Sequence, residues 1–528
     1  MTHRLTRKRL FRSLRHGALL GALLLAACAT APPRVPKTQT QALAPVADTA
    51  SARYIQSQVT SHPGRSGFRL VTKSPDALLS RVVLADHAAH SLDLQYYIFA
   101  NDATGRLLAQ RLLAAADRGV RVRLLVDDAV NGDANDLLRD LATHPKIEVR
   151  LFNPFRTLNP SLPSKVAQFA LEGRRLNRRM HNKSFIADGW VAVIGGRNIG
   201  DPYFDAAEQG NFRDLDVLAI GPVVHEAQNT FDAYWNSDAA VPVHALAQQP
   251  STAEVAVARS KLLQDARAFA QSDYAQALLD NLPEGPSADR RDRWLWGDAQ
   301  LVADSPQKVE VQHDDPALRI GPRLRNVFDA AAHEVDVITP YFVPGKRGTQ
   351  YFVDLTQRGV SVNILTNSLA STDEPAVHVG YSRYREPLLA GGVHLFELRP
   401  QPGEPQPATA GGTSAGDSLH AKAAVVDDRY VFVGSMNMDQ RSKLLNTEMG
   451  VIIDCPELAR DAHAYFTAAT APGVSFSVSL EPGAMHSHLV WRARDQGEPV
   501  TLEHEPGPTA KRRIEVALIK LLPIEGLL

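Results

Sequence analysis

The sequence predicts an α/β protein of two similar lobes, each built on a mixed β-sheet flanked by helices. Three observations lead to this prediction. The chain has 528 residues, which is long for a single core. Strand-like and helix-like segments alternate along it. A polar motif, His-x-Lys-x4-Asp-x6-Gly-x-x-Asn, occurs in the first half and returns 239 residues later with the same internal spacing.

The elements come in the same order in both halves. In the first half, helical patterns over 76–90 and 104–119 alternate with strand patterns over 91–99, 120–128 and 146–154. In the second half, helical patterns over 324–334 and 346–359 alternate with strand patterns over 335–343, 360–367 and 393–400. We therefore interpret 76–235 and 316–475 as an internal duplication with a largely buried sheet in each copy.

Composition divides the chain into six segments. We expect a signal peptide at 1–27, a flexible tether at 28–65, a first lobe at 66–240, a connector at 241–306, a second lobe at 307–475 and a C-terminal extension at 476–528. The connector is mostly polar with helical stretches. A loop rich in Pro and Gly at 399–418 could rim an active site or be a tolerated insertion.

The first 28 residues have the composition of an export signal. Six cations precede an apolar run of about a dozen residues, which is too short to span a bilayer. The run ends at Cys28 and resembles a bacterial lipobox, so we expect Cys28 to be lipidated and to anchor the chain on the periplasmic side of a membrane. Ala29 after it, rather than an aspartate, favours the outer membrane. An ordinary secretory signal or an uncleaved anchor is the alternative.

Charge and thiol content argue against a nucleic-acid binder and against a cysteine nucleophile. The net charge is −1, and it becomes −7 once the cations of 1–27 are removed. Because nucleic-acid binding depends on clustered cations, no nucleic-acid partner is expected. The thiol that remains besides Cys28 is Cys455, which we interpret as a buried residue at a strand end and not as a nucleophile.

The repeated motif places the same side chains on two hairpins. Short strand patterns flank turns at Asp188-Gly189 and Asp427-Asp428. Residues two apart on a strand share a face, so each His points the same way as its Lys. The motif residues are His181, Lys183, Asp188, Gly195 and Asn198 in the first copy and His420, Lys422, Asp427, Gly434 and Asn437 in the second.

These residue types suit the transfer of a phosphodiester. An imidazole can attack phosphorus or move protons near neutral pH, and Lys and Asn donate to phosphate oxygens. Two copies facing each other supply a nucleophile and an acid across one phosphate, with a covalent phosphohistidine between the two steps. A metal site fits poorly, since each copy offers one His and one Asp with a Lys between them. A structural His–Asp pair in a hairpin explains one copy but not two.

On these motifs the chain resembles the phospholipase D (PLD) superfamily, whose signature is the doubled His-x-Lys-x4-Asp motif followed by Gly-Ser-x-Asn. The second copy matches with Ser435, whereas Gly196 stands in the serine position of the first. The resemblance implies an active site where two α/β lobes meet and a two-step reaction without metal or cofactor. It also implies that Glu448 and, by alignment of the two copies, Asp214 orient the histidines, with strand-edge surface acids as the alternative.

The candidate site residues follow from the motif and the resemblance together. The candidate catalytic residues are His181, Lys183, Asp188, Asn198, Asp214, His420, Lys422, Asp427, Asn437 and Glu448, with Lys183, Lys422, Asn198, Asn437 and Ser435 as phosphate ligands. Of these, we expect Asp188 and Asp427 to fix the hairpin turns rather than touch substrate. The resemblance favours His181 as the nucleophile.

Segments around the motifs resemble bacterial cardiolipin synthases, and a lipid anchor would hold the site at phospholipids. The leading hypothesis is therefore a phosphatidyltransferase that makes cardiolipin from phosphatidylglycerol and a second phospholipid, or a PLD-type hydrolase if water is the acceptor. A periplasmic nuclease and an inactive binding protein are the alternatives. An accessory membrane protein is left open, as is contact of the basic cluster 174–179 and the basic, then apolar, C-terminus with lipid headgroups.

Overall fold

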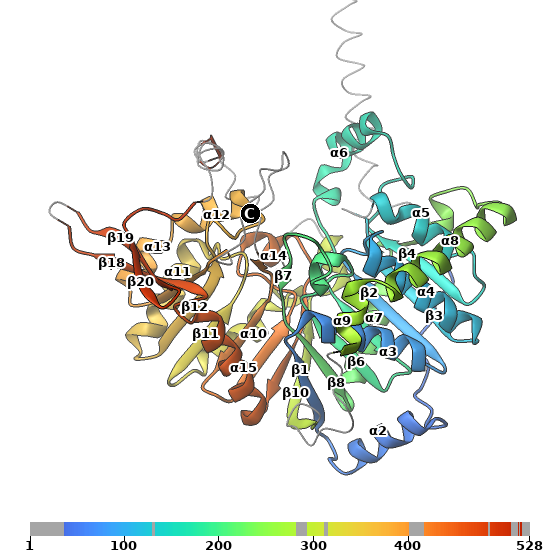
Figure 1. Cartoon of the computed structure of the whole chain (residues 1–528), viewed down its shortest axis with the longest axis horizontal. Coiled ribbons are helices and arrows are strands. Elements are labelled where there is room, and N and C mark those ends of the chain that lie inside the picture. Colours follow the sequence, from blue (N-terminus) through green and yellow to red (C-terminus); the bar gives the residue numbers. More distant parts are fainter. Residues whose placement is uncertain are drawn as a thin grey trace, which may run out of the picture.

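The computed structural model describes residues 36–128, 132–280, 293–310, 315–400, 417–483, 486–507, 516, 518 and 519. The expected signal peptide and Cys28 lie outside these residues, as do most of the loop 399–418 and most of the C-terminal 508–528. Two α/β lobes lie side by side, one coloured blue to green and the other yellow to red (Figure 1).

The first lobe is built on a mixed sheet. In order of pairing, its strands are β1 (Ser66–Val71), β8 (Asp216–Ile220), β6 (Val191–Gly195), β5 (Ser184–Ala187), β2 (Ser91–Tyr96), β3 (Arg121–Asp127), β4 (Ile147–Phe152) and β9 (Ala240–Pro242). The β2–β3 and β3–β4 pairs are parallel, and the other pairs are antiparallel. Parallel strands need crossover connections, which explains the helix between each parallel pair.

The second lobe repeats this order strand for strand. Its strands are β10 (Leu295–Ala303), β17 (Met449–Asp454), β16 (Tyr430–Gly434), β15 (Ala423–Val426), β11 (Glu334–Ile338), β12 (Ser361–Asn367), β13 (His394–Leu398) and β18 (Ser475–Glu481). The antiparallel β1–β10 pair joins both sheets into one of 18 strands. The prediction of a duplicated α/β fold is confirmed.

Helices cover the sheets on both sides. In the first half of the chain they are α2 (Ala50–Thr60), α3 (Ser74–His87), α4 (Ala103–Asp117), α5 (Asn135–Leu141), α6 (Leu162–Leu176), α7 (Pro222–Asn236), α8 (Thr252–Ala270) and α9 (Asp273–Asp280). In the second half they are α10 (Gly321–Asp329), α11 (Gly345–Gln357), α12 (Pro375–Ser382), α13 (Arg385–Ala390), α14 (Gln440–Leu444) and α15 (Pro456–Thr470). The equivalent helices α7 and α15 contribute to one apolar core that contains strand residues of both lobes, so the lobes share buried surface.

Residues 36–65 correct the expectation of a flexible tether. Although the segment lacks apolar periodicity, its backbone carbonyls accept hydrogen bonds from buried arginines of the first lobe: Thr38 from Arg150 at 2.7 Å and Thr40 from Arg123 at 3.0 Å. Helix α2 follows, with the Thr49 side chain capping its first turn. The described part of the segment therefore packs on the first lobe, because backbone groups can satisfy buried side chains without an apolar pattern.

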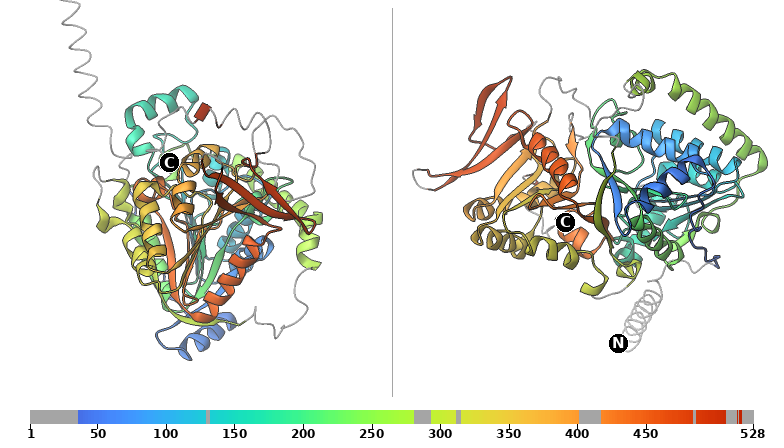
Figure 2. Two further views of the ribbon diagram at one scale, coloured as in Figure 1. Left: turned by 90° about the vertical axis from the view of Figure 1, so that its left-hand side faces the viewer. Right: turned by 90° about the horizontal axis from the view of Figure 1, so that it is seen from below.

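The expected connector and C-terminal extension also carry strands of the second sheet. Strand β10 lies inside 241–306 and pairs with both β1 and β17. Beyond β18, strands β19 (His488–Asp495) and β20 (Glu498–Leu502) extend the same sheet as a hairpin (Figure 2). The second lobe thus begins earlier and ends later than composition indicated. Among the described residues, no helix is long and apolar enough to cross a bilayer.

Candidate active site

Two short strand pairings carry the repeated motifs to the junction of the lobes. Strand β14 (Ser418–Leu419), directly before His420, runs parallel to β7 (Phe212–Arg213) of the first lobe. In the same way, the His181 N–H donates to the Thr447 carbonyl at 2.9 Å, and the His420 N–H donates to the Arg213 carbonyl at 2.8 Å. Each histidine is therefore held beside the chain segment that precedes an acid of the opposite lobe.

Each of the two histidines is hydrogen-bonded to an acid of the opposite lobe. His181 of the first lobe donates from Nδ1 to Glu448 of the second lobe, with 2.9 Å between Nδ1 and Oε2. His420 of the second lobe donates to Asp214 of the first lobe, with 2.6 Å between Nδ1 and Oδ2. Both carboxylates are fully buried. The alternative of surface acids is wrong for both. An Nδ1–H held by a carboxylate leaves Nε2 of each ring for chemistry.

The motif lysines lie against the same histidines. Lys183 Nζ donates to the His181 carbonyl at 2.7 Å and lies 5.5 Å from the centre of the Tyr97 ring. Lys422 Nζ donates to the His420 carbonyl and lies 3.1 Å from His420 Nδ1. Both lysines are buried, so their charges act in a medium that screens weakly. Two buried lysines beside two imidazoles make a site suited to an anion, although burial and the charge of Lys422 lower the pKa of Lys183 well below its ordinary value.

The two motif asparagines have different hydrogen-bond partners. Asn198 accepts from the Ile98 N–H at 3.1 Å and donates to the Tyr203 hydroxyl at 2.8 Å. The Asn437 side-chain oxygen is buried and has no hydrogen-bond partner among the described residues. Asn198 is thus held by the protein, whereas Asn437 keeps an unsatisfied group at the site.

Ser435 and Gly196 occupy equivalent places with different surroundings. The Ser435 hydroxyl donates to Oε2 of Glu448, the same oxygen that receives His181. A Cβ at Gly196 would lie 2.3 Å from Oδ1 of Asp214, so a serine there would displace the carboxylate that holds His420. The departure of the first motif copy therefore has a steric cause.

Burial controls the proton affinities of the site. It lowers the pKa of His181 to about 4 and that of His420 to about 3, and the nearby lysine charges act in the same direction. Burial alone would raise the pKa of Asp214 and Glu448, yet the facing histidines lower both. Burial also lowers the pKa of Lys422 to about 8. At neutral pH the site thus holds neutral imidazoles beside ionised carboxylates.

The motif aspartates lie apart from this cluster. Asp188 accepts from the backbone N–H groups of 89–91 at 2.7–2.8 Å, and Asp427 accepts from those of 332–334 at 2.7–2.8 Å. Both have positive φ, 51° and 54°, at the tips of the β5–β6 and β15–β16 hairpins. These tips are at the strand ends opposite to the histidines, about 20 Å along the chain. Both carboxylates serve the turn, and neither takes part in the catalytic cluster.

The basic cluster before His181 is largely internal. Arg175 pairs with Glu172 at 2.7 Å, and Arg179 lies 3.4 Å from Asp127. Arg178 donates to the Lys308 carbonyl at 3.0 Å. Of the four arginines, Arg174 alone is exposed. Neither a solvated charged face nor a headgroup cluster describes this segment, which instead fixes the backbone that leads into His181.

Aromatic walls around the histidines were not predicted from the sequence. The ring of Tyr97 meets that of His181 edge-on, with centroids 5.2 Å apart. On the other side Tyr203 and Phe212 contact the His420 ring at 5.2 and 5.1 Å. Phe212 could have been found from the sequence, because it lies two residues before the candidate acid Asp214. These rings limit the access of water to the imidazoles.

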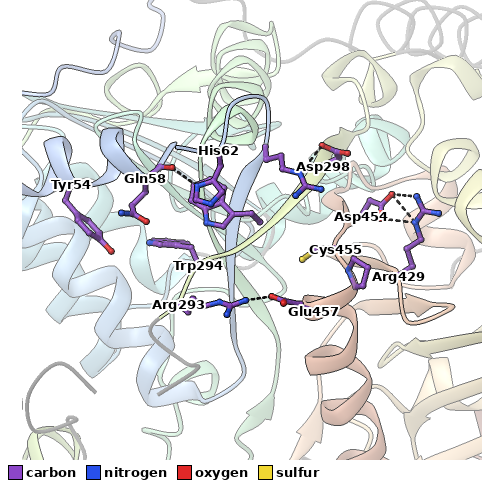
Figure 3. Close-up of a pocket in the computed structure, with 13 residues that line it drawn as sticks. Tyr54, Gln58, His62, Arg293, Trp294, Asp298, Arg429, Asp454, Cys455 and Glu457 are labelled. Carbon is purple, nitrogen blue, oxygen red and sulfur yellow. Dashed lines mark hydrogen bonds and ion pairs between the residues drawn. The ribbon is translucent and has the colours of Figure 1, made fainter. Parts of the chain in front are cut away.

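A separate cavity lies at the junction of the lobes, away from the two histidines. It measures about 890 Å³ and lies between α2, β10 and the start of α15 (Figure 3). Its charged groups pair with one another, Arg293 with Glu457 at 2.5 Å and Arg429 with Asp454 at 2.7 Å. Cys455 lines it, buried directly after β17 as predicted. The cavity contains none of the motif residues and is not the catalytic site.

Comparison with known proteins matches both lobes. The family model described as "Cardiolipin synthase, PLD-like domain" matches residues 82–235 and again 324–469. Cardiolipin synthase C of Escherichia coli (strain K12) is 39% identical over 477 residues, covering 89% of this chain and 98% of that protein. Cardiolipin synthase B of the same strain is 27% identical over 375 residues, 69% of this chain and 71% of that protein.

A solved structure shares the fold. The crystal structure of phosphatidylserine synthase from Haemophilus influenzae Rd KW20 matches with a TM-score of 0.53 at 14% identity, over 90% of this chain and 99% of that one. At this identity the likeness concerns the arrangement of the two lobes. Both ranges matched by the family model fall inside the lobes described above.

Proposed function

This chain belongs to the family of PLD-like cardiolipin synthases, and we propose that it transfers a phosphatidyl group to phosphatidylglycerol and so forms cardiolipin. The observation that carries the chemistry is the pair of buried histidines, each bound to a carboxylate of the opposite lobe. Such a pair offers one nucleophile and one proton carrier across a single phosphate.

In the first step, Nε2 of His181 attacks the phosphorus of a phospholipid. The P–N bond forms while the bond from phosphorus to the headgroup oxygen breaks, and protonated His420 gives its Nε2 proton to the leaving alkoxide. The proton reaches His420 when the anionic phosphate binds, since negative charge near Nε2 favours the imidazolium. Glu448 and Asp214 orient the two rings through their Nδ1–H groups.

In the second step, a hydroxyl of phosphatidylglycerol takes the place of the headgroup. Neutral His420 removes the hydroxyl proton, the oxygen attacks phosphorus, and the P–N bond to His181 breaks. With phosphatidylglycerol as donor and acceptor, the products are cardiolipin and glycerol. Lys183, Lys422 and the side-chain NH2 group of Asn437 donate to the phosphate oxygens, where charge is greatest in the transition state.

Purified protein incubated with phosphatidylglycerol tests this proposal. We expect mass spectrometry of the extracted lipids to show cardiolipin, and no turnover in H181A or H420A. If water competes as acceptor, phosphatidic acid accompanies it. The lipid assignment is wrong if neither lipid forms, and cleavage of DNA that weakens with added salt would instead indicate a nuclease.

The lipid anchor belongs to the same proposal. Lipidation of Cys28 would hold the site at its substrate on the periplasmic side of a membrane, with the outer membrane favoured by Ala29. Cells fed a radioactive fatty acid should label the parent protein. Label that persists in C28A would contradict it.

A further inference from the structure

Helix α6 exposes an apolar stripe on the face of the molecule that carries α12. Leu162, Val166 and Phe169 are 75%, 61% and 52% exposed and recur at the spacing of one helix face. The buried residues of this 15-residue helix are Glu172, Arg175 and Leu176, all in its last turns. Figures 1 and 2 show α6 standing clear of both lobes. Within the part of the chain that the structure describes, none of its first ten residues is buried.

A projecting helix of this length is marginal in water by itself. Isolated helices need about 12–15 residues even with favourable sequences, and most of their stability in proteins comes from packing of the apolar face. At Glu172 the backbone departs from helical geometry, with φ −123° and ψ 17°, where the projecting part meets the anchored part. The helix would therefore be stabilised if its apolar stripe packed against a partner.

The charges of α6 favour an anionic partner. Lys165 and Arg174 are exposed, whereas the one acid of the helix, Glu172, is buried and paired with Arg156 and Arg175. Exposed apolar and cationic side chains without exposed acid are the composition of helices that lie in a bilayer interface. Three side chains expose far less than the roughly 800 Å² per partner of a stable protein interface, which disfavours a second copy.

The far end of α6 is coupled to the catalytic cluster. Asn153 and Arg175 bond each other at 2.7 Å, and Asn153 also receives the Arg179 guanidinium on its carbonyl at 3.2 Å. The Met180 N–H donates to Asp127 at 2.8 Å, directly before His181. Four residues separate the end of α6 from His181, and all of the named contacts are buried.

We propose that α6 is an interfacial helix that lays its Leu162–Val166–Phe169 stripe into an anionic phospholipid bilayer and so holds the catalytic face at the lipid surface. The choice of a bilayer as partner rests on the proposed phospholipid substrate. The contact is additional to the anchor at Cys28, which tethers the chain but orients nothing.

Site-specific fluorescence on the full chain tests the contact separately from the anchor. An environment-sensitive thiol label on F169C should shift to shorter wavelength on phosphatidylglycerol vesicles and be quenched by brominated acyl chains at least about fivefold more than the same label on V257C. Val257 is the matched control because it is 69% exposed on α8, outside the stripe. The parent protein measures labelling of the native thiols.

Three results would overturn the docking. The label on F169C stays unquenched, or it is quenched no more than the label on V257C, or its shift depends on protein concentration and not on vesicles. The last result would indicate a second copy of the chain as the occupant. Vesicles of phosphatidylcholine alone should bind the stripe several-fold more weakly than vesicles with phosphatidylglycerol.

Activity separates this inference from the proposed function. V166E/F169E should form cardiolipin on vesicles at least about tenfold more slowly, since two charges replace apolar contacts at the interface, while V257E should match the parent. Undiminished activity of V166E/F169E overturns the docking and leaves the function standing. Quenching at residue 169 without any cardiolipin formed by the parent refutes the function and leaves the docking standing.

Discussion

The two lobes agree in every strand of the shared sheet order and differ in the groups that support their histidines. In the second lobe Ser435 donates to Glu448, which holds His181; in the first, Gly196 leaves the space that Asp214 needs to hold His420. Away from the site, buried Asp93 pairs with Arg123 at 2.6 Å, whereas the equivalent Asp336 has Asn363 and His463. Duplication kept the reacting groups and let their supports diverge.

Removal of either acid should cause the largest loss. E448Q and D214N keep the shape but no longer select the Nδ1–H tautomer or stabilise the imidazolium, so kcat should fall about 10³–10⁴-fold in each. Steady-state assays of cardiolipin formation measure this. A loss under tenfold in one variant would show that only the other lobe's acid serves the chemistry.

The Ser435 and Gly196 positions should not be interchangeable. G196S should reduce kcat at least about 100-fold, because the added Cβ displaces Asp214, which holds His420. S435A removes one hydrogen bond to Glu448 and should cost about tenfold or less. Equal losses in both variants would contradict the asymmetry between the lobes. G189A, which is in the hairpin turn away from the histidines, reports the effect of a Cβ that strains the backbone and approaches the Gln228 side chain to 2.8 Å.

The pH profile should reflect burial more than the ordinary values of the side chains. Because a proton reaches His420 only when the phosphate binds, the profile is measured as kcat with saturating substrate. Attack needs neutral His181, whose pKa is about 4, so kcat should fall below about pH 4 and not below pH 6.5. It should fall again above about pH 8, where Lys422 loses its charge. K422R should move the upper limb to higher pH, since Arg stays protonated. A parent profile that stays flat to pH 10 would contradict the role of Lys422.

The smallest effect concerns stability outside the site. Burial lowers the pKa of His463, but the hydrogen bond to Asp336 and the charges of Asp336, Glu334 and Asp428 together raise it above its ordinary value. Its contribution to stability is therefore present below the unfolded pKa near 6.5 and is lost as pH rises through the raised value. H463Q should therefore lower the free energy of unfolding more at pH 6 than at pH 9. The difference should be under about 1 kcal/mol because His463 is partly exposed, and melting temperatures measured at the two pH values report it. Equal destabilisation by H463Q at the two pH values would contradict this role of His463.

The sequence predicted the duplicated α/β lobes and most of the residues that meet at the junction of the lobes, because apolar periodicity and motif spacing are local features. The turn role of Asp188 and Asp427 was also expected from the hairpin pattern. The pairing of each histidine with an acid of the opposite lobe could not be predicted from a local pattern. Asp214 is 206 positions from His420 in the sequence, and Glu448 is 267 positions from His181. The segment 36–65 was misjudged since its contacts use backbone carbonyls, which composition does not reveal.

The most direct test of the central claim asks which histidine carries the phosphatidyl group. A phosphatidyl ester with a nitrophenol leaving group needs no acid for the first step, so H420A should still react once and keep the lipid on the peptide that contains His181. H181A should acquire no adduct. Digestion and mass spectrometry after mild quenching locate the adduct. An adduct on His420 in H181A, with none in H420A, would contradict the account and exchange the roles of the lobes.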